Sequence, residues 1–196
     1  LKLAASNVNN HGYQSYVGIP ALRKAMCNWY KNTYGVDLNP ENEILPLLGS
    51  KEGISHISSA FLNPGDKVLV PNPGYPTYTS ATHLASAIPI YYELDEHNNW
   101  APDFSSIDES ILREAKIIWT NYPNMPTGAS GNASIFKKLI EVAKEYKILI
   151  VNDNPYSLVL NDGNPVSILQ IEGAKEVCIE LNSLCSESAC NIESKL

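Results

Sequence analysis

The segment Ile148-Leu149-Ile150-Val151-Asn152-Asp153-Asn154-Pro155-Tyr156 is the clearest indication of the fold in this chain. Its four leading apolar residues show no polar alternation, a pattern that predicts a strand buried on both faces, as in parallel sheets covered by helices. Asp153 therefore lies at the carboxyl end of a strand, where open α/β sheets bind ligands. A helix N-cap or turn aspartate is the alternative interpretation of this residue.

Further strands and helices alternate on both sides of this stretch. Apolar runs predict strands over 67–70, 88–94, 116–120 and 177–182, and 43–48 is a further short apolar run. Helical spacing of apolar residues predicts helices over 20–34, 54–62, 77–87, 103–113 and 134–146, whereas 1–18 is predicted to be an exposed loop. The alternation indicates an α/β fold, a mainly parallel sheet with helices on both faces.

Composition excludes several classes of protein. The chain has 196 residues, 44% of them hydrophobic and 18% charged, which is typical of a globular protein. Its net charge of −7 and scattered basic residues give no basis for binding nucleic acid or an anionic membrane. No apolar run approaches the roughly 20 residues that span a bilayer, and no signal-peptide pattern opens the chain. We therefore expect a cytoplasmic protein.

Cysteine and histidine are too dispersed to form an obvious metal site. Neither the zinc-type CxxC spacing nor the cysteine density of a disulfide scaffold is present. We expect free thiols and no bound metal. The residues concerned are Cys27, Cys178, Cys185, Cys190, His11, His56, His83 and His97.

Gly49-Ser50-Lys51-Glu52-Gly53 follows the short apolar run directly and precedes a helical pattern. Glycines and a serine at a helix start let successive backbone N–H groups converge on an anion, and the helix dipole adds partial positive charge. The stretch has neither the GxxxxGK[ST] nor the GxGxxG spacing. A phosphate cradle and an ordinary strand-to-helix turn both remain open.

Proline-rich loops follow two other predicted strands. Pro71-Asn72-Pro73-Gly74-Tyr75-Pro76 holds Tyr75 in a rigid frame, where the ring either stacks on a ligand or packs under the loop. The second such loop is Asn121-Tyr122-Pro123-Asn124-Met125-Pro126-Thr127-Gly128. Both loops lie at the strand ends where a ligand is expected.

Taken together, these loops resemble the large domain of class I/II pyridoxal-phosphate aminotransferases of fold type I, especially the bacterial aspartate-like and diaminopimelate-like enzymes. The resemblance runs to about Ser183. It rests on the order and spacing of six motifs: Tyr13-x4-Gly18-x4-Arg23, Gly49-Ser50-Lys51, Tyr75, Tyr122 to Gly128, Asp153-x-x-Tyr156 and Ser183.

The resemblance implies pyridoxal 5'-phosphate as cofactor and an amino acid and a 2-oxo acid as substrates. Asp153 would pair with the protonated pyridine nitrogen, Tyr156 would hydrogen-bond the phenolic oxygen, and Tyr75 would stack on the ring. The phosphate would be held by Gly49, Ser50, Lys51 and Ser183. Tyr13 would reach the phosphate of a neighbouring subunit, which implies a homodimer.

The sequence departs from the family at two sites. Met125 stands where the family has an asparagine, and its side chain cannot donate a hydrogen bond to the phenolic oxygen. The Schiff-base lysine should come three residues after Ser183, where this chain has Ser186, or Glu187 if one residue is inserted. Neither side chain can replace the lysine, so we expect the chain to be inactive by itself.

We expect residues 1–196 to be a partial cofactor-binding large domain, without the remainder of that domain or the small domain, with 184–196 departing from the family. A catalytically inactive protein that keeps the cofactor pocket for binding or interaction is the alternative function. A dinucleotide-binding dehydrogenase domain is disfavoured because the GxGxxG fingerprint is missing.

Overall fold

The computed structural model describes residues 2–13, 15–159 and 164–183, and the chain divides into two compact units, 1–46 and 47–196. The first unit contains α1 (Lys2–Ala5), the 3-10 turn η1 (Val8–Asn10) and α2 (Pro20–Tyr34). The predicted exposed loop over 1–18 thus contains two short helical turns that its polar composition concealed.

Helix α2 has the bounds that the sequence predicts. Pro20 occupies the first helical turn, where its missing N–H costs nothing, and Gly35 ends the helix in the left-handed region at φ 70°. Inside this unit the guanidinium of Arg23 is buried, lies 3.6 Å from Glu41 and donates to the carbonyl of Pro40. Arg23 thereby ties α2 to the loop that follows it.

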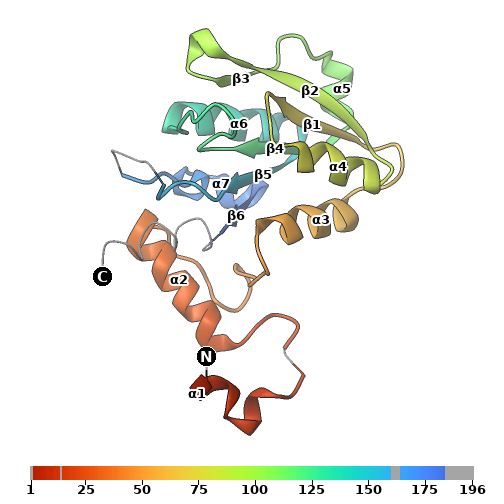
Figure 1. Cartoon of the computed structure of the whole chain (residues 1–196). Coiled ribbons are helices and arrows are strands. Elements are labelled where there is room, and N and C mark those ends of the chain that lie inside the picture. Colours follow the sequence, from red (N-terminus) through yellow and green to blue (C-terminus); the bar gives the residue numbers. More distant parts are fainter. Residues whose placement is uncertain (1, 14, 160–163, 184–196) are drawn as a thin grey trace. The chain divides into compact units, whose positions relative to one another are not determined.

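The second unit is built on one six-stranded sheet (Figure 1). Its strand order is β3-β2-β1-β4-β5-β6, and every neighbouring pair is parallel except β2 and β3. The sheet is therefore mainly parallel, as the sequence predicts. The strands are β1 (Lys67–Asn72), β2 (Ile88–Asp95), β3 (Ala101–Asp103), β4 (Ala115–Asn121), β5 (Leu149–Asn154) and β6 (Cys178–Asn182).

Helices cover both faces of this sheet, as expected (Figure 1). One face packs against α3 (Ser50–Phe61) and α4 (Pro76–Leu84), with a buried core that includes Val70, Trp119 and Val151. The opposite face packs against α5 (Glu109–Glu114), α6 (Ala133–Tyr146) and α7 (Ala174–Val177), alongside the short turn η3 (Ile168–Gln170). Because both faces are buried, the central strands are continuously apolar.

Two predicted elements differ from the structure. The short apolar run over 43–48 forms no strand. The helix predicted over 103–113 is limited to α5, because Asp103 accepts a hydrogen bond from the Ser105 N–H and Asp108 caps α5 by accepting from the Ser110 N–H. Strand β3 ends at Asp103, and the 3-10 turn η2 (Glu96–Asn98) comes before β3.

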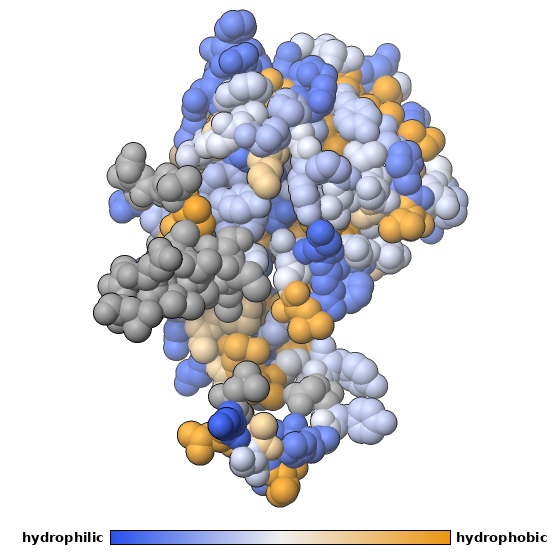
Figure 2. Space-filling view, in the orientation of Figure 1, coloured by the Kyte–Doolittle hydropathy of each residue, from blue (hydrophilic) through white to orange (hydrophobic). Residues whose placement is uncertain are grey.

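On the face of the second unit that Figure 2 shows, hydrophilic residues dominate and hydrophobic residues form small separate groups. Among the described residues, no helix has the length and apolar character required to cross a membrane. Within the same part of the chain, no three His, Cys, Asp or Glu side chains are grouped to hold a metal ion.

Candidate functional site

A cleft of about 120 Å³ lies in the second unit, beside the carboxyl ends of β4 and β5. Seven of the residues predicted from the sequence as ligand-binding line this cleft, and three further residues complete its wall. The predicted residues are Ser50, Lys51, Tyr75, Met125, Asp153, Tyr156 and Ser183; the others are Tyr78, Asn121 and Pro155. The chain thus brings together residues from five separate segments of sequence.

The N-terminus of α3 forms one wall. Gly49 is its N-cap, and its φ of 119° is open to glycine but strained for other residues. Its N-cap residue makes no side-chain capping bond, and the first two helical residues, Ser50 and Lys51, line the cleft. Helix α3 packs closely on β6: a Cβ atom added to Gly53 would lie only 2.7 Å from the Leu181 side chain. No strand forms in the described residues before α3, 2–13 and 15–49, so the strand-to-helix turn interpretation lacks its strand, and the phosphate cradle stays a prediction.

Asp153 lies on the adjacent wall, inside β5 and only 3% exposed, so it is neither a helix N-cap nor a turn aspartate. The Tyr78 hydroxyl donates to its Oδ2 at 2.9 Å. Its Oδ1 is buried and has no hydrogen-bond partner among the described residues. Burial raises the pKa of Asp153 to about 6, and the hydroxyls of Tyr78 and Ser50 partly offset the rise.

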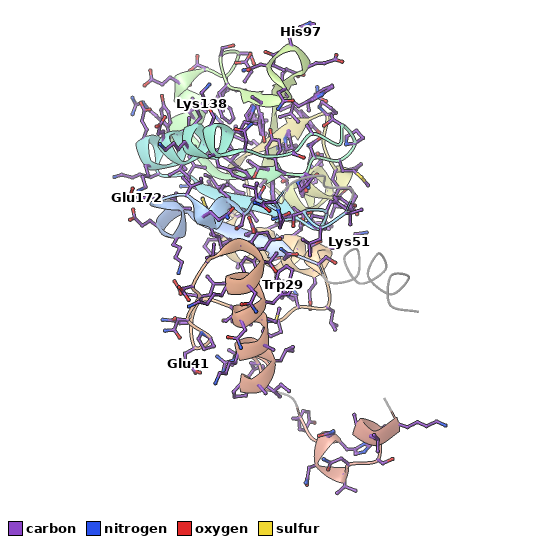
Figure 3. The ribbon with its side chains drawn as sticks, turned by 90° about the vertical axis from the view of Figure 1, so that its left-hand side faces the viewer. Trp29, Glu41, Lys51, His97, Lys138 and Glu172 are labelled. Atoms are coloured by element: carbon purple, nitrogen blue, oxygen red, sulfur yellow. The ribbon has the colours of Figure 1, made fainter. Side chains whose placement is uncertain are left out.

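Aromatic rings build the floor of the cleft. Tyr78 stacks on Trp119 with ring centroids 5.2 Å apart, and Tyr75 meets Tyr78 edge-on at 5.7 Å. Lys51, labelled in Figure 3, places its Nζ 5.8 Å from the Tyr75 ring centroid. Hydrogen bonds to Thr77 and Lys51 lower the pKa of Tyr75. Tyr75 therefore packs partly against the core and also presents itself to the cleft.

Asn121 links the two strands at the base of the cleft. It lies opposite Asp153 in the parallel register, and its Nδ2 donates to the Asp153 carbonyl at 2.7 Å. Its Oδ1 accepts from the Met125 N–H at 2.7 Å, which fixes the start of the proline-rich loop. Asn121 thereby holds the ends of β4 and β5 together.

Tyr78 and Asn121 are the residues that the sequence analysis missed. Tyr78 follows Tyr75 by three residues, one helical turn, so a helix beginning at Pro76 would have indicated that both rings share a face. Asn121 is the last residue of β4, as Asp153 is near the end of β5. Aligning the carboxyl ends of the strands would have identified it.

The remaining predicted residues have different positions. Met125 is 42% exposed at the cleft, Tyr156 is half-buried there, and the N–H of Ser183 is held by Asn182 Oδ1 at 2.9 Å. Tyr13 is fully exposed in the first unit. Ser186 and Glu187, at the expected lysine position, lie outside the described residues.

These features suit a flat ligand with an anionic group and a protonated ring nitrogen. An uncapped helix N-terminus attracts an anion, an exposed aromatic face accepts a planar ring, and a buried carboxylate oxygen without a partner accepts a charged N–H. The donor set therefore fits a phosphorylated pyridine. Asp153 Oδ1 is the most specific part of this fit, because a buried oxygen without a partner is otherwise costly.

The chain is similar to a known protein family and to individual proteins. Residues 1–185 match the family model described as aminotransferase class I and II. Two curated relatives, the LL-diaminopimelate aminotransferases of Dehalococcoides mccartyi (strain 195) and Aquifex aeolicus, are each 49% identical to the chain, over 182 and 184 residues. These alignments cover 92% and 93% of the chain, and 47% and 48% of the relatives.

Several solved structures closely resemble the fold of this chain. Substrate-bound BacF from Bacillus subtilis superimposes with a TM-score of 0.90 at 42% identity, covering 93% of the chain and 46% of that structure. A probable N-succinyldiaminopimelate aminotransferase from Thermus thermophilus gives a TM-score of 0.86 at 34% identity, covering 93% of the chain and 49% of that structure. The chain spans about half the length of the relatives that it matches.

Proposed function

The chain belongs to the class I and II aminotransferases, and from this premise we propose that its cleft binds pyridoxal 5'-phosphate for the transfer of an amino group between an amino acid and a 2-oxo acid. The observation that carries the proposal is the buried Oδ1 of Asp153, which has no hydrogen-bond partner among the described residues. A pyridinium N–H at this oxygen would satisfy it. Membership of the family does not by itself locate the ring nitrogen at Asp153 in this chain.

Each wall of the cleft then has a role in holding the cofactor. The backbone N–H groups at Gly49, Ser50 and Lys51, with the Ser183 hydroxyl, would bind the phosphate. Tyr75 would support the ring face, and Tyr156 would donate to the phenolic oxygen. When bound, the cofactor's protonated ring draws electrons from the substrate α-carbon, and Asp153 keeps that ring protonated.

Tyr78 and Asn121 would act indirectly in this arrangement. The Tyr78 hydroxyl occupies Oδ2 and so would leave Oδ1 of Asp153 to accept from a ligand. Asn121 fixes the backbone carbonyl of the same residue. Both contacts hold Asp153 in one orientation, so it would need no rearrangement to meet a ring nitrogen.

We propose a second function, cofactor binding without turnover, because the sequence has Ser186 or Glu187 where the family has its lysine. Neither Ser186 nor Glu187 would replace that amine as the base that moves the substrate proton. Met125 also offers no donor at the phenolic oxygen. The contacts to phosphate and ring nitrogen do not depend on the lysine, so binding survives.

The substrate class and assembly of the whole protein are also proposals. The identity to LL-diaminopimelate aminotransferases supports an amino donor of the diaminopimelate type. The exposed Tyr13 supports a homodimer in which this residue reaches the partner's phosphate site. Cys27 and Cys178 form no disulfide with another described residue, which would suit a reducing cytoplasm.

Titration with two ligands tests the proposed binding. Pyridoxal 5'-phosphate and pyridoxal are each added to the purified chain, and quenching of tryptophan fluorescence is followed, with Trp119 stacked on Tyr78 as the nearest reporter. Saturable binding of the phosphorylated form, with much weaker binding of pyridoxal, is expected. Equal binding of the two would show that α3 holds no phosphate, and no saturation would refute the cofactor proposal.

A further inference from the structure

Glu180 of β6 carries a carboxylate enclosed by donors from two other segments. Its Oε1 accepts from the Ser167 hydroxyl at 2.8 Å and from Asn154 Nδ2 at 3.3 Å. Its Oε2 accepts from the Ile168 N–H at 3.0 Å and from Asn152 Nδ2 at 3.1 Å. Four donors therefore converge on one carboxylate beside the sheet.

The two asparagines in this cluster flank Asp153 on both sides. Residues 152 and 154 point to the face of the sheet covered by α6 and α7, whereas residue 153 points to the face covered by α3 and α4, because strand side chains alternate. Glu180 lies opposite Asn152 in the β5–β6 register. Its carboxylate thus binds the side-chain amides of the two residues that flank Asp153, on the face opposite the cleft.

We infer that Glu180 is a positioning residue for Asp153: by holding Asn152 and Asn154 it fixes the strand end from behind, while Tyr78 and Asn121 fix Asp153 from the cleft side. The inference rests on the proposed function, because it concerns the direction in which Asp153 meets a ring nitrogen. Glu180 itself touches no bound group.

Burying the Glu180 carboxylate costs free energy, and this cost supports a specific role for the residue. Enclosure raises the pKa of Glu180, and the hydrogen bonds from Ser167, Asn152, Ile168 and Asn154 offset part of the rise. An apolar residue would avoid that cost but would leave the asparagine amides without these acceptors. The network continues to β4, where Thr120 donates to Asn152 Oδ1 at 2.9 Å. Glu180 therefore sets the alignment of three strand ends.

The test follows the titration of Asp153 by carbon-13 NMR of the full chain labelled at aspartate carboxyls, with Asp153→Asn to assign the signal. Glu180→Gln removes the charge while keeping the shape. Ser167→Ala removes one donor without any change in charge. Glu176→Gln is the matched control, since Glu176 is an exposed carboxylate on α7, paired with Lys144 at 2.9 Å.

Burial is the largest contribution to the raised pKa of Asp153, so a loosened strand end that admits water should lower its titration midpoint from about 6. Glu180→Gln and Ser167→Ala should both lower the titration midpoint of Asp153, and the decrease should be smaller in Ser167→Ala. Glu176→Gln should leave the midpoint unchanged. A fall in Glu180→Gln alone would mean that only charge acts, and would overturn the positioning role. If Glu180→Gln does not fold, Ser167→Ala decides alone: an unchanged midpoint refutes the inference.

Cofactor affinity provides the second readout. Both network variants should bind pyridoxal 5'-phosphate at least several-fold more weakly than the unaltered chain, and the control should bind equally well. Unchanged affinity in folded Glu180→Gln and Ser167→Ala would contradict the inference. If the unaltered chain binds no cofactor, the proposed function fails, while the Asp153 titration still tests Glu180.

Discussion

The hydroxyl of Tyr78 donates a 2.9 Å hydrogen bond to Oδ2 of Asp153, a residue 75 positions further along the chain. The bond joins the first turns of α4 to the end of β5. It also divides the carboxylate into one oxygen satisfied by the protein and one, Oδ1, without a partner among the described residues. Substitutions of Tyr78 and of Asp153 should therefore have different effects on stability.

Tyr78→Phe should destabilise the chain most where Asp153 is charged. Hydrogen bonds to charged groups contribute about 1.5–3 kcal/mol and neutral ones about 0.5–1.5 kcal/mol. Urea unfolding should therefore show the larger loss of stability at pH 8 and the smaller at pH 5. Tyr91→Phe is the control, because Tyr91 is half-exposed and pairs only with Thr79. An equal loss at both pH values would contradict the assignment of the bond to a carboxylate.

Asp153→Asn should stabilise the cofactor-free chain above pH 7. The folded pKa of Asp153 is about 6, above its ordinary 3.8, so the folded state holds this proton more tightly than the unfolded state. Its contribution to stability is complete below about pH 4 and is lost as pH rises through 6, a loss of roughly 3 kcal/mol. The advantage of the variant should appear at pH 8 and vanish near pH 4. A pH-independent difference in unfolding free energy would contradict this account.

Amino transfer by the chain alone should not exceed that of free cofactor. A positioned base contributes roughly 10²–10⁴-fold to proton transfer, and the sequence provides no lysine at the family position. Purified chain is incubated with cofactor, an amino donor and 2-oxoglutarate, and glutamate is quantified. Sustained production above the control without protein would show that another residue replaces the lysine.

The chain should associate through its first unit. Large apolar side chains in the first 22 residues are exposed, a pattern that favours burial against a partner. These residues include Leu3, Val8, Tyr13, Tyr16, Val17 and Ile19. Light scattering should show a dimer or larger oligomer at micromolar concentration, and Tyr13→Asp should shift it toward monomer more than His11→Asp. A monomer in the unaltered chain would refute the proposed dimer.

The sequence predicted the sheet well because its strands are buried on both faces, so their apolar runs stand out, as in Ile148 to Val151. It failed at 103–113, where Asp103 and Asp108 hold local turns that helical periodicity does not reveal. The short strand β3 was missed for another reason, because three residues carry too little pattern.

The cleft was predicted residue by residue from motif order, and the described part of the chain brings most of those residues together. Tyr78, Asn121 and Glu180 were not predicted, because each acts on Asp153 through a contact between distant segments. The three-residue spacing from Tyr75 and the end of a strand were signals for Tyr78 and Asn121, whereas Glu180 becomes visible only when strand register is known.

If Asp153 receives the ring nitrogen of pyridoxal 5'-phosphate, the dissociation constant of this cofactor should differ between Asp153→Ala and Lys51→Ala. Loss of a charge-assisted hydrogen bond should weaken binding by about 10- to 100-fold in Asp153→Ala. Lys51→Ala should have a smaller effect, because the backbone N–H groups of α3 remain. Equal weakening in the two variants, or unchanged affinity in Asp153→Ala, would contradict the claim.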